Sequence, residues 1–518
     1  MLHRPQPDLR AAPQLRPRSG QYAPTIPAKP TMVGSQRFTF LNQERQCATS
    51  ADWMSADVSK LWIYNLHYFD DLNATDASTR TSWHRDLLER WVDENSPGHG
   101  YGWEPYPTSR RIVNWIKGGL RRDLLSQACR ESLAVQSRWL TQRMEYHLLG
   151  NHLLANAKAL VYAGSFFCGP EADRWRERGA EIMSEQLREQ VLPDGGHFEL
   201  STMYHAAVLE DLLDLVNISQ AYGQEPPRQW LLVIASMFRW LTVMTHPDGD
   251  IAFFNDAAFG VAPRLVELQA YASRLGLRDD QELDGHLKVM EASGYVCAAM
   301  GAAYLLCDCG PVGPDYLPGH AHADTLSFEL SIFGRRVFVN SGTSNYENDA
   351  ERHRQRGTAA HNSVTVDGEN SSEVWASFRV ARRARAQLHA ASSNSDSVII
   401  EASHDGYRRF ARHGEHRRRW TLDVDSLLIE DQIQGQFHDA KAHFHLHPDV
   451  DVLVHSSCEL HLRWSSGCAK VLCDGARELA VHESTWHPHF GVTIASHCIV
   501  AKMKGPSLTT HIVWGTAE

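Results

Sequence analysis

The sequence lacks any apolar run of about 18 residues, the length that a helix needs to span a bilayer, so no membrane span is expected. Close cysteine pairs are also scarce. Among ten cysteines only Cys307 and Cys309 are near neighbours, which argues against a zinc ribbon or a disulfide framework. Positive net charge is missing too, because the formal charge is −11. Tight non-specific binding to nucleic acid is therefore not expected.

The N-terminal residues lack the apolar segment of a secretory signal and are rich in Pro, Arg and Gln. We therefore predict a flexible leader over residues 1–45. Without a visible signal peptide the sequence favours a cytoplasmic protein, with the periplasm as the alternative. The sequence gives no indication of the oligomeric state.

The apolar spacing changes character along the chain and predicts a multidomain protein with α and β parts. Residues 46–285 show helical spacing, as in 83–91 and 208–216, and turn-rich stretches suit stacked helical hairpins. This predicts an α/α layer or toroid. Residues 286–518 contain short alternating segments such as 336–339, 397–401 and 443–447, which favour an antiparallel β-sandwich.

The segment 319–329, Gly-His-Ala-His-Ala-Asp-Thr-Leu-Ser-Phe-Glu, is the most informative in the chain. Strand periodicity would place His320, His322 and Asp324 on one face, which continues as apolar residues. We predict a core strand whose first half lines a cavity. Two imidazoles and a carboxylate at such an edge suggest metal binding, proton transfer or both.

Further donors follow this segment. Asn340 ends a hydrophobic strand, and His361 opens the next one after an Arg-rich loop. His322, His361 and an oxygen donor, either Asn340 or Asp324, could hold one structural divalent metal, zinc or calcium. No organic cofactor is indicated. Because the chain has 29 histidines, some of these side chains could equally be hydrogen-bonded core residues.

The helical half contributes polar candidates of its own. Asn151 and His152 lie in an otherwise apolar helical segment, where they either form a buried network or point into a cleft. Tyr204 follows a glycine turn near the start of a helix. Trp103 belongs to a Trp-rich stretch that could stack on sugar rings or simply pack between helices.

Four motifs together resemble the heparinase II/III family of polysaccharide lyases. They are Gly150-Asn-His152, Gly196-His-Phe-Glu-Leu-Ser-Thr-Met-Tyr204, Gly319-His-Ala-His-Ala-Asp324 and Gly357-Thr-Ala-Ala-His-Asn362. The resemblance implies an incomplete (α/α) toroid followed by an antiparallel β-sandwich. It also implies β-elimination on an anionic, uronic-acid-containing polysaccharide, either glycosaminoglycan-like or a bacterial exopolysaccharide.

The resemblance further implies residue roles. Asn151, helped by His152, would neutralise the substrate carboxylate, Tyr204 would act as base or acid, and His320 would complete proton transfer. Because free tyrosine is a poor base near neutral pH, its pKa would need to be perturbed. The candidate substrate-binding residues are Trp103, Arg110, Arg111, Glu199 and Arg356, with the arginines forming a basic cleft.

His322 and His361 match metal-binding positions of the family, but the third position, often an aspartate, is Asn340 here. A neutral amide is a weaker ligand than a carboxylate.

Three alternatives remain open on the sequence. His322, Asp324 and His361 have the form of a non-haem iron oxygenase triad, and Asp194 with Asp256 could be the carboxylate pair of a glycoside hydrolase. A non-catalytic polysaccharide-binding protein is the third.

Overall fold

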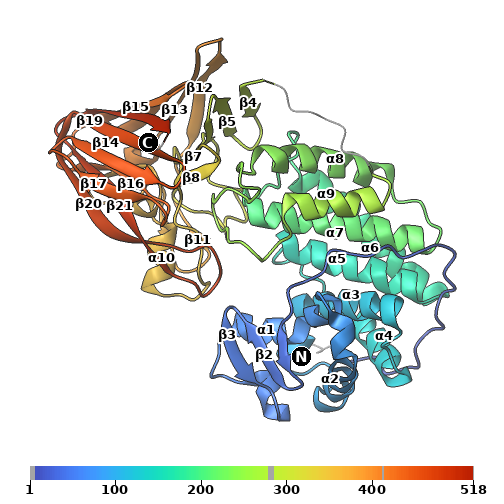
Figure 1. The fold of residues 1–518 in the computed structure, drawn as a ribbon. Coiled ribbons are helices and arrows are strands. Elements are labelled where there is room, and N and C mark those ends of the chain that lie inside the picture. Colours follow the sequence, from blue (N-terminus) through green and yellow to red (C-terminus); the bar gives the residue numbers. More distant parts are fainter. Residues whose placement is uncertain (1–5, 278–284, 411–412, 517–518) are drawn as a thin grey trace. The chain divides into compact units, whose positions relative to one another are not determined.

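The computed structural model describes residues 6–277, 285–410 and 413–516 (Figure 1). It divides into two compact units. The first takes its described residues from 1–190, 207–235 and 266–279, and the second from 191–206, 236–265 and 280–518. Residues 191–206 and 236–265, which lie in the predicted helical half, are thus grouped with the strands. No helix among the described residues is both long and apolar enough to cross a membrane.

Helices dominate the first unit, and the expected helices at 83–91 and 208–216 are confirmed within α2 and α7. The helices are α1 (Lys60–Tyr68), α2 (Thr81–Glu94), α3 (Pro105–Arg122), α4 (Gln127–Thr141), α5 (Gly150–Phe166), α6 (Pro170–Gln190), α7 (Thr202–Ala221), α8 (Arg228–Val243) and α9 (Leu265–Arg274). The unit division passes through α7 and α8, whose bounds extend into the second unit.

Helix α5 packs against α3, α4 and α6. Its Lys158 is buried and bonds to Asp211 (2.6 Å) and Asp214 (2.5 Å) of α7, and Lys117 of α3 reaches the same Asp214 at 2.5 Å. A buried charge is tolerated only when it is paired, so these contacts fix the register of three helices.

The prediction of a flexible leader over 1–45 is wrong for the described residues 6–45. They contain β1 (Met32–Gly34) and β2 (Arg37–Phe40), which continue into β3 (Gln43–Gln46), and an extended segment that lies along the helices. Backbone hydrogen bonds join Arg16 to Phe166 (2.9 Å) and Gly20 to Ala221 (3.0 Å). The polar composition suggested flexibility because it shows no local apolar pattern. The segment is instead held by hydrogen bonds to helices that are distant in the sequence.

The described part of the second unit holds three larger antiparallel sheets and one two-stranded hairpin. The β4–β8 sheet runs in the order β4 (Leu287–Met290), β5 (Tyr295–Met300), β6 (Ala303–Asp308), β7 (Phe328–Ile332), β8 (Arg335–Phe338). The β12–β17 sheet runs β12 (Ala386–Ser393), β13 (Ser397–His404), β14 (His413–Asp423), β15 (Ser426–Gly435), β22 (Ser507–Thr516), β19 (Gly467–Asp474), β18 (Glu459–Trp464), β17 (Asp451–Val454). The β20–β9 sheet runs β20 (Ala476–Trp486), β21 (Ile494–Met503), β16 (Ala440–His445), β9 (Val364–Val366).

One hydrophobic core takes side chains from all three sheets. Phe328 of β7, Trp420 of β14 and Phe444 of β16 are fully buried in it. Buried residues alternate with exposed ones along strands such as β19. This alternation is the arrangement of a sandwich, in which one face of each sheet meets the core. The short helix α10 (Ala350–Arg356) lies in the connection between β8 and β9.

The expected strand over 319–329 is only partly present. Strand β7 begins at Phe328, and the residues before it form turns and irregular backbone. Their amides bond to loops instead of to a ladder: Ala323 donates to the Arg356 carbonyl (2.9 Å) and His322 donates to Asn255 Oδ1 (2.9 Å). The alternation of His and Ala therefore reflects a largely buried loop, in which His322 and both alanines are buried and His320 is partly exposed.

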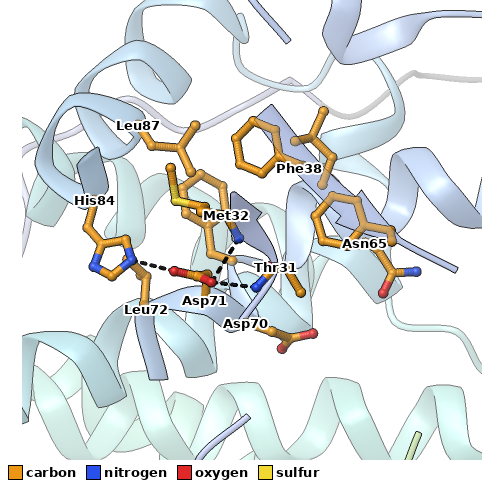
Figure 2. A pocket seen from close by; sticks show the side chains of 12 residues that line it. Thr31, Met32, Phe38, Asn65, Asp70, Asp71, Leu72, His84 and Leu87 are labelled. Atoms are coloured by element: carbon orange, nitrogen blue, oxygen red, sulfur yellow. Dashed lines mark hydrogen bonds and ion pairs between the residues drawn. The ribbon is translucent and has the colours of Figure 1, made fainter. Parts of the chain in front are cut away.

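A buried carboxylate holds the N-terminal strands to the helices of the first unit. Asp71 accepts from the amides of Thr31 (2.6 Å) and Met32 (2.9 Å) and from the His84 ring (2.7 Å) (Figure 2). The Arg80 side chain also donates to it (2.8 Å). Burial opposes its ionisation, but these four donors outweigh burial and lower the pKa of Asp71 to about 2.

We expect Asp71→Asn to destabilise the first unit by about 2 kcal/mol at neutral pH. The folded-state pKa is depressed from 3.8 to about 2, so this stabilisation is present above the unfolded value and is lost as the pH falls towards 2. Urea unfolding at pH 7 and at low pH measures it. The difference between wild type and variant should shrink on acidification, while the exposed Asp76→Asn should match wild type at both pH values.

Candidate functional site

The centre of the candidate site is the carboxylate of Asp256, which is fully buried in the second unit. It accepts hydrogen bonds from His320 Nδ1 (2.9 Å), from His322 Nε2 (2.8 Å) and from both terminal nitrogens of Arg352, one of them at 2.8 Å. Burial disfavours the charge, but Arg352 and the two histidines outweigh burial and hold the pKa of Asp256 well below its usual range. The Thr343 hydroxyl also donates to it (3.2 Å), so Asp256 is an anion surrounded by fixed donors.

The anion sets the tautomer of His320. Because the ionised Asp256 only accepts, the Nδ1 of His320 carries a proton. The other nitrogen, Nε2, lies 3.8 Å from Glu199 Oε2, and the imidazole is 17% exposed. The site thus holds a partly exposed imidazole whose ring orientation is fixed by Asp256.

Two phenols lie beside this imidazole. The Tyr204 ring packs on His320 with centroids 4.1 Å apart, and the Tyr204 hydroxyl is 2.8 Å from that of Tyr346. Tyr204 occupies the first turn of α7, where its amide donates to Ser201 Oγ (3.2 Å). Burial and the facing phenol raise the pKa of Tyr204, and burial with the Asp256 charge raises that of Tyr346.

The resemblance requires a perturbed pKa for Tyr204, and burial shifts that pKa upward. Tyr204 is therefore a neutral phenol at pH 7, which can donate a proton.

The residues expected to bind a metal do lie together. His322 Nδ1 faces His361 Nε2 at 3.3 Å, and His361 Nδ1 lies 3.2 Å from Asn340 Oδ1. Burial lowers the pKa of His322 to about 4 and that of His361 to about 3, so both rings are neutral at pH 7. With Asp256 and Asn340 accepting from the outer nitrogens, the two inner nitrogens present lone pairs to each other.

This donor set fits a metal only in part. Two nitrogens bound tetrahedrally to one zinc at about 2.0–2.1 Å would be about 3.3 Å apart, as here. The third position does not fit: Asn340 is neutral, its oxygen accepts from His361, and its buried Nδ2 has no partner in the described structure. No cluster of three His, Cys, Asp or Glu side chains arranged for a metal occurs among the described residues. These side chains therefore do not form a complete metal site.

The two rival enzyme chemistries lose their geometric basis. Asp324 accepts from the Asn255 amide (3.0 Å) and does not complete a three-donor cluster with His322 and His361, as an iron triad requires. The hydrolase pair fails because both carboxylates are engaged: Asp194 accepts from the amide (2.7 Å) and the hydroxyl (2.9 Å) of Ser293, and Asp256 is saturated.

Asn151 and His152 lie in the first unit, at the start of α5. Leu149 (φ 56°) and Gly150 (φ 55°) adopt left-handed φ values that turn the chain into the helix. His152 Nδ1 lies 3.1 Å from Glu145, and its ring packs on Tyr106 with centroids 4.5 Å apart. Both side chains are partly exposed. Arg110, also partly exposed, pairs with Asp70 at 3.2 Å.

Three predicted substrate-binding residues are instead buried structural groups. Trp103 donates to the Asn95 carbonyl (3.2 Å), Arg111 bonds to Gln136 (3.0 Å), and Arg356 donates to the carbonyls of Ala321 (2.9 Å) and Ala376 (2.7 Å). A buried indole or guanidinium must satisfy its N–H groups inside the protein, so none of the three is open to a ligand. Glu199 is buried beside His320.

Sequence reasoning missed Tyr346 and Arg352, and it considered Asp256 only as a hydrolase carboxylate. Tyr346 and Arg352 belong to the stretch between β8 and the end of α10, which has no periodic pattern, and Asp256 lies 64 positions from His320. Only the closeness of Tyr346 and Arg352 to the His361 motif could have drawn attention to them.

The molecule is thus a helical-layer and antiparallel-sandwich protein that carries a carboxylate-anchored His/Tyr cluster. Residues 120–274 match the family model described as Heparinase II/III N-terminus, and residues 283–515 match Heparinase II/III-like, C-terminal. The chain belongs to the heparinase II/III family.

Individual relatives agree with this family. The heparin-sulfate lyase of Bacteroides stercoris is 28% identical over 248 residues, 43% of this chain and 37% of that protein. The heparin-sulfate lyase of Pedobacter heparinus is 25% identical over 246 residues, 43% of this chain and 36% of that protein. The chain therefore aligns with well under half the length of these curated relatives.

Solved structures extend the likeness to nearly the whole fold. A heparinase III structure matches with a TM-score of 0.73 at 18% identity, over 90% of this chain and 79% of that one. A heparan sulfate lyase HepC mutant from Pedobacter heparinus matches with a TM-score of 0.65 at 17% identity, over 93% and 82%. The fold is an incomplete (α/α) toroid followed by an antiparallel β-sandwich, as predicted.

Zinc content tests the third ligand position. We expect Asn340→Asp to retain more zinc than wild type after dialysis, since a carboxylate adds an anionic donor beside two neutral imidazoles. Elemental analysis of the purified proteins measures this. His361→Ala in the Asn340→Asp background should remove the gain. Equal zinc in wild type and Asn340→Asp would show that position 340 does not control binding.

Proposed function

We propose that this protein is a polysaccharide lyase that cleaves a uronic-acid-containing polysaccharide by β-elimination. The observation that carries the proposal is an oriented imidazole beside two neutral phenols: Asp256 holds the His320 ring through Nδ1, and burial keeps Tyr204 and Tyr346 protonated. Family membership and the names of the relatives, heparin-sulfate lyases, support the same chemistry. We propose a glycosaminoglycan-like substrate, with a bacterial exopolysaccharide as the alternative.

In the reaction the C5–H bond of the uronate breaks, its electron pair forms the C4–C5 double bond, and the C4–O4 bond breaks. His320 Nε2 takes the C5 proton, and the Tyr204 hydroxyl, itself bonded to Tyr346, gives a proton to the leaving O4. The uronate carboxylate gains negative charge on the way and needs a neutralising donor. By resemblance Asn151 and His152, in the first unit, supply that donor.

The reaction has a direct assay, because the unsaturated product absorbs in the ultraviolet. Heparosan, heparan sulfate, hyaluronan and alginate should be screened as uronate polymers. We expect Tyr204→Phe and His320→Ala to lower kcat by about 10²–10⁴ each on whichever polymer is cleaved. Tyr346→Phe should lower it less, because it removes a partner of the donor and leaves the donor itself. Full activity in both of the first two variants would refute these roles.

The role of Asp256 can be separated from its contribution to stability by a control elsewhere in the sandwich. Asp431 is equally buried and accepts from His416 Nε2 (2.7 Å) and from two nitrogens of Arg418 (2.7 and 3.0 Å). It does not contact His320 or Tyr204.

We expect Asp256→Asn to lower kcat by about 10²–10⁴ with KM little changed, because an amide can present an N–H to His320 and move its proton to Nε2. Asp431→Asn should lower the melting temperature without changing kcat per folded molecule. Steady-state kinetics and thermal unfolding of both variants provide the test. If the two variants lost activity only in proportion to stability, Asp256 would have no part in positioning His320.

A further inference from the structure

A small hairpin in the second unit presents aromatic side chains to solvent. It consists of β10 (Val374–Trp375) and β11 (Arg379–Val380), paired in antiparallel fashion with Trp375 opposite Arg379. Trp375 is 55% exposed and Phe378 is 41% exposed. Exposed large aromatic side chains lose the free energy of burial, so two of them on one hairpin suggest a use.

Two buried arginines of α10 hold the backbone of the hairpin in place. Buried Arg352 donates to the Ser377 carbonyl from Nε (3.1 Å) and from a terminal nitrogen (3.0 Å), and buried Arg356 donates to the Ala376 carbonyl (2.7 Å). Ala376 has a left-handed φ of 47°, a strained conformation that persists only where its surroundings impose it. The tip is therefore preorganised, which lowers the entropy lost on binding a ligand.

The hairpin continues the cluster described above. The Phe378 ring lies 5.9 Å from that of His320 and 5.2 Å from that of Tyr346, centroid to centroid. Arg352 bonds to Asp256 and to the hairpin at once. A chain that leaves the His320 site across Phe378 would next meet the other side chains of the hairpin.

The charge of the hairpin suits an anion. Arg379 is exposed, and its guanidinium has no partner among the described residues. Nearby Arg382, in contrast, is paired with Glu373 at 2.8 Å. An arginine beside aromatic rings can bind a carboxylate or sulfate while the rings cover the apolar C–H face of a sugar.

We propose that the β10–β11 hairpin is a sugar-binding subsite, in which Trp375 and Phe378 stack on pyranose rings of the acidic polysaccharide and Arg379 pairs with its anionic group. The ligand class rests on the proposed function, but binding can be measured without turnover.

The experiment compares hairpin variants with matched controls elsewhere in the same unit. Trp375→Ala, Phe378→Ala and Arg379→Gln test the subsite. Leu453→Ala, at a residue that is 67% exposed on the edge strand β17, controls for loss of an exposed apolar side chain, and Arg335→Gln on β8 controls for loss of an exposed charge. All are made in the Tyr204→Phe background, and calorimetry measures binding of heparosan and heparan sulfate oligosaccharides.

We expect Trp375→Ala and Phe378→Ala each to weaken binding roughly tenfold, and Trp375→Phe to restore most of the loss. Arg379→Gln should reduce the dependence of the dissociation constant on salt. With Tyr204 intact, Trp375→Ala should raise KM more than it lowers kcat. The two control variants should bind as their parent does.

The inference fails if the hairpin variants bind within twofold of the controls, or if no uronate oligosaccharide binds at all. It also fails if Trp375→Ala changes only the oligomeric state in sedimentation, since the hairpin would then be a contact between copies of the chain. Failure of the proposed function looks different: oligosaccharides would bind in a Trp375-dependent way, yet wild type would form no unsaturated product.

Discussion

The site depends on one buried negative charge. A lone carboxylate inside the sandwich would be strongly unfavourable, and Asp256 is tolerated because the guanidinium of Arg352 neutralises it directly. That pairing leaves His322 free to stay neutral while it donates to the anion. Without Arg352, a histidine would have to become the counter-charge. The orientation of two imidazoles depends on this anion, and Arg352 links the same anion to the β10–β11 hairpin.

Much of the architecture was predictable, because periodicity reports which face of an element is buried. The helical spacing of 208–216 and the alternation at 397–401 are found as helix α7 and strand β13. The same reasoning failed at His320, His322 and Asp324, where a largely buried loop imitates a strand pattern without a neighbouring ladder. Similarly, the polar spacing at residues 6–45 hid an extended segment that is ordered by hydrogen bonds to distant helices. Hydrophobic periodicity predicts the backbone conformation only where that conformation does not depend on contacts with distant segments.

The site residues divide in the same way. Motif reasoning selected Tyr204 and His320, which do lie in contact, and His322, Asn340 and His361, which lie next to one another. It could not select Tyr346 or Arg352, which acquire meaning only through folding. It also overvalued arginine: Arg111 and Arg356 looked like anion-binding groups, but in this chain many guanidiniums bond to backbone carbonyls, as Arg138 and Arg418 also do. The sequence alone does not show whether an arginine binds a ligand or bonds to the protein's own backbone.

The sandwich contains a second cluster that resembles the candidate site. Asp431 accepts from Arg418 and from His416, whose other nitrogen lies 3.3 Å from a second imidazole, His404, much as Asp256 accepts from Arg352 and from His322, which faces His361. Both arrangements are buried and neutralised. Asp256 differs in holding a further imidazole, His320, which is 17% exposed and packs on Tyr204. The Asp431 cluster could therefore take part in proton transfer only after it gained a base that reaches solvent.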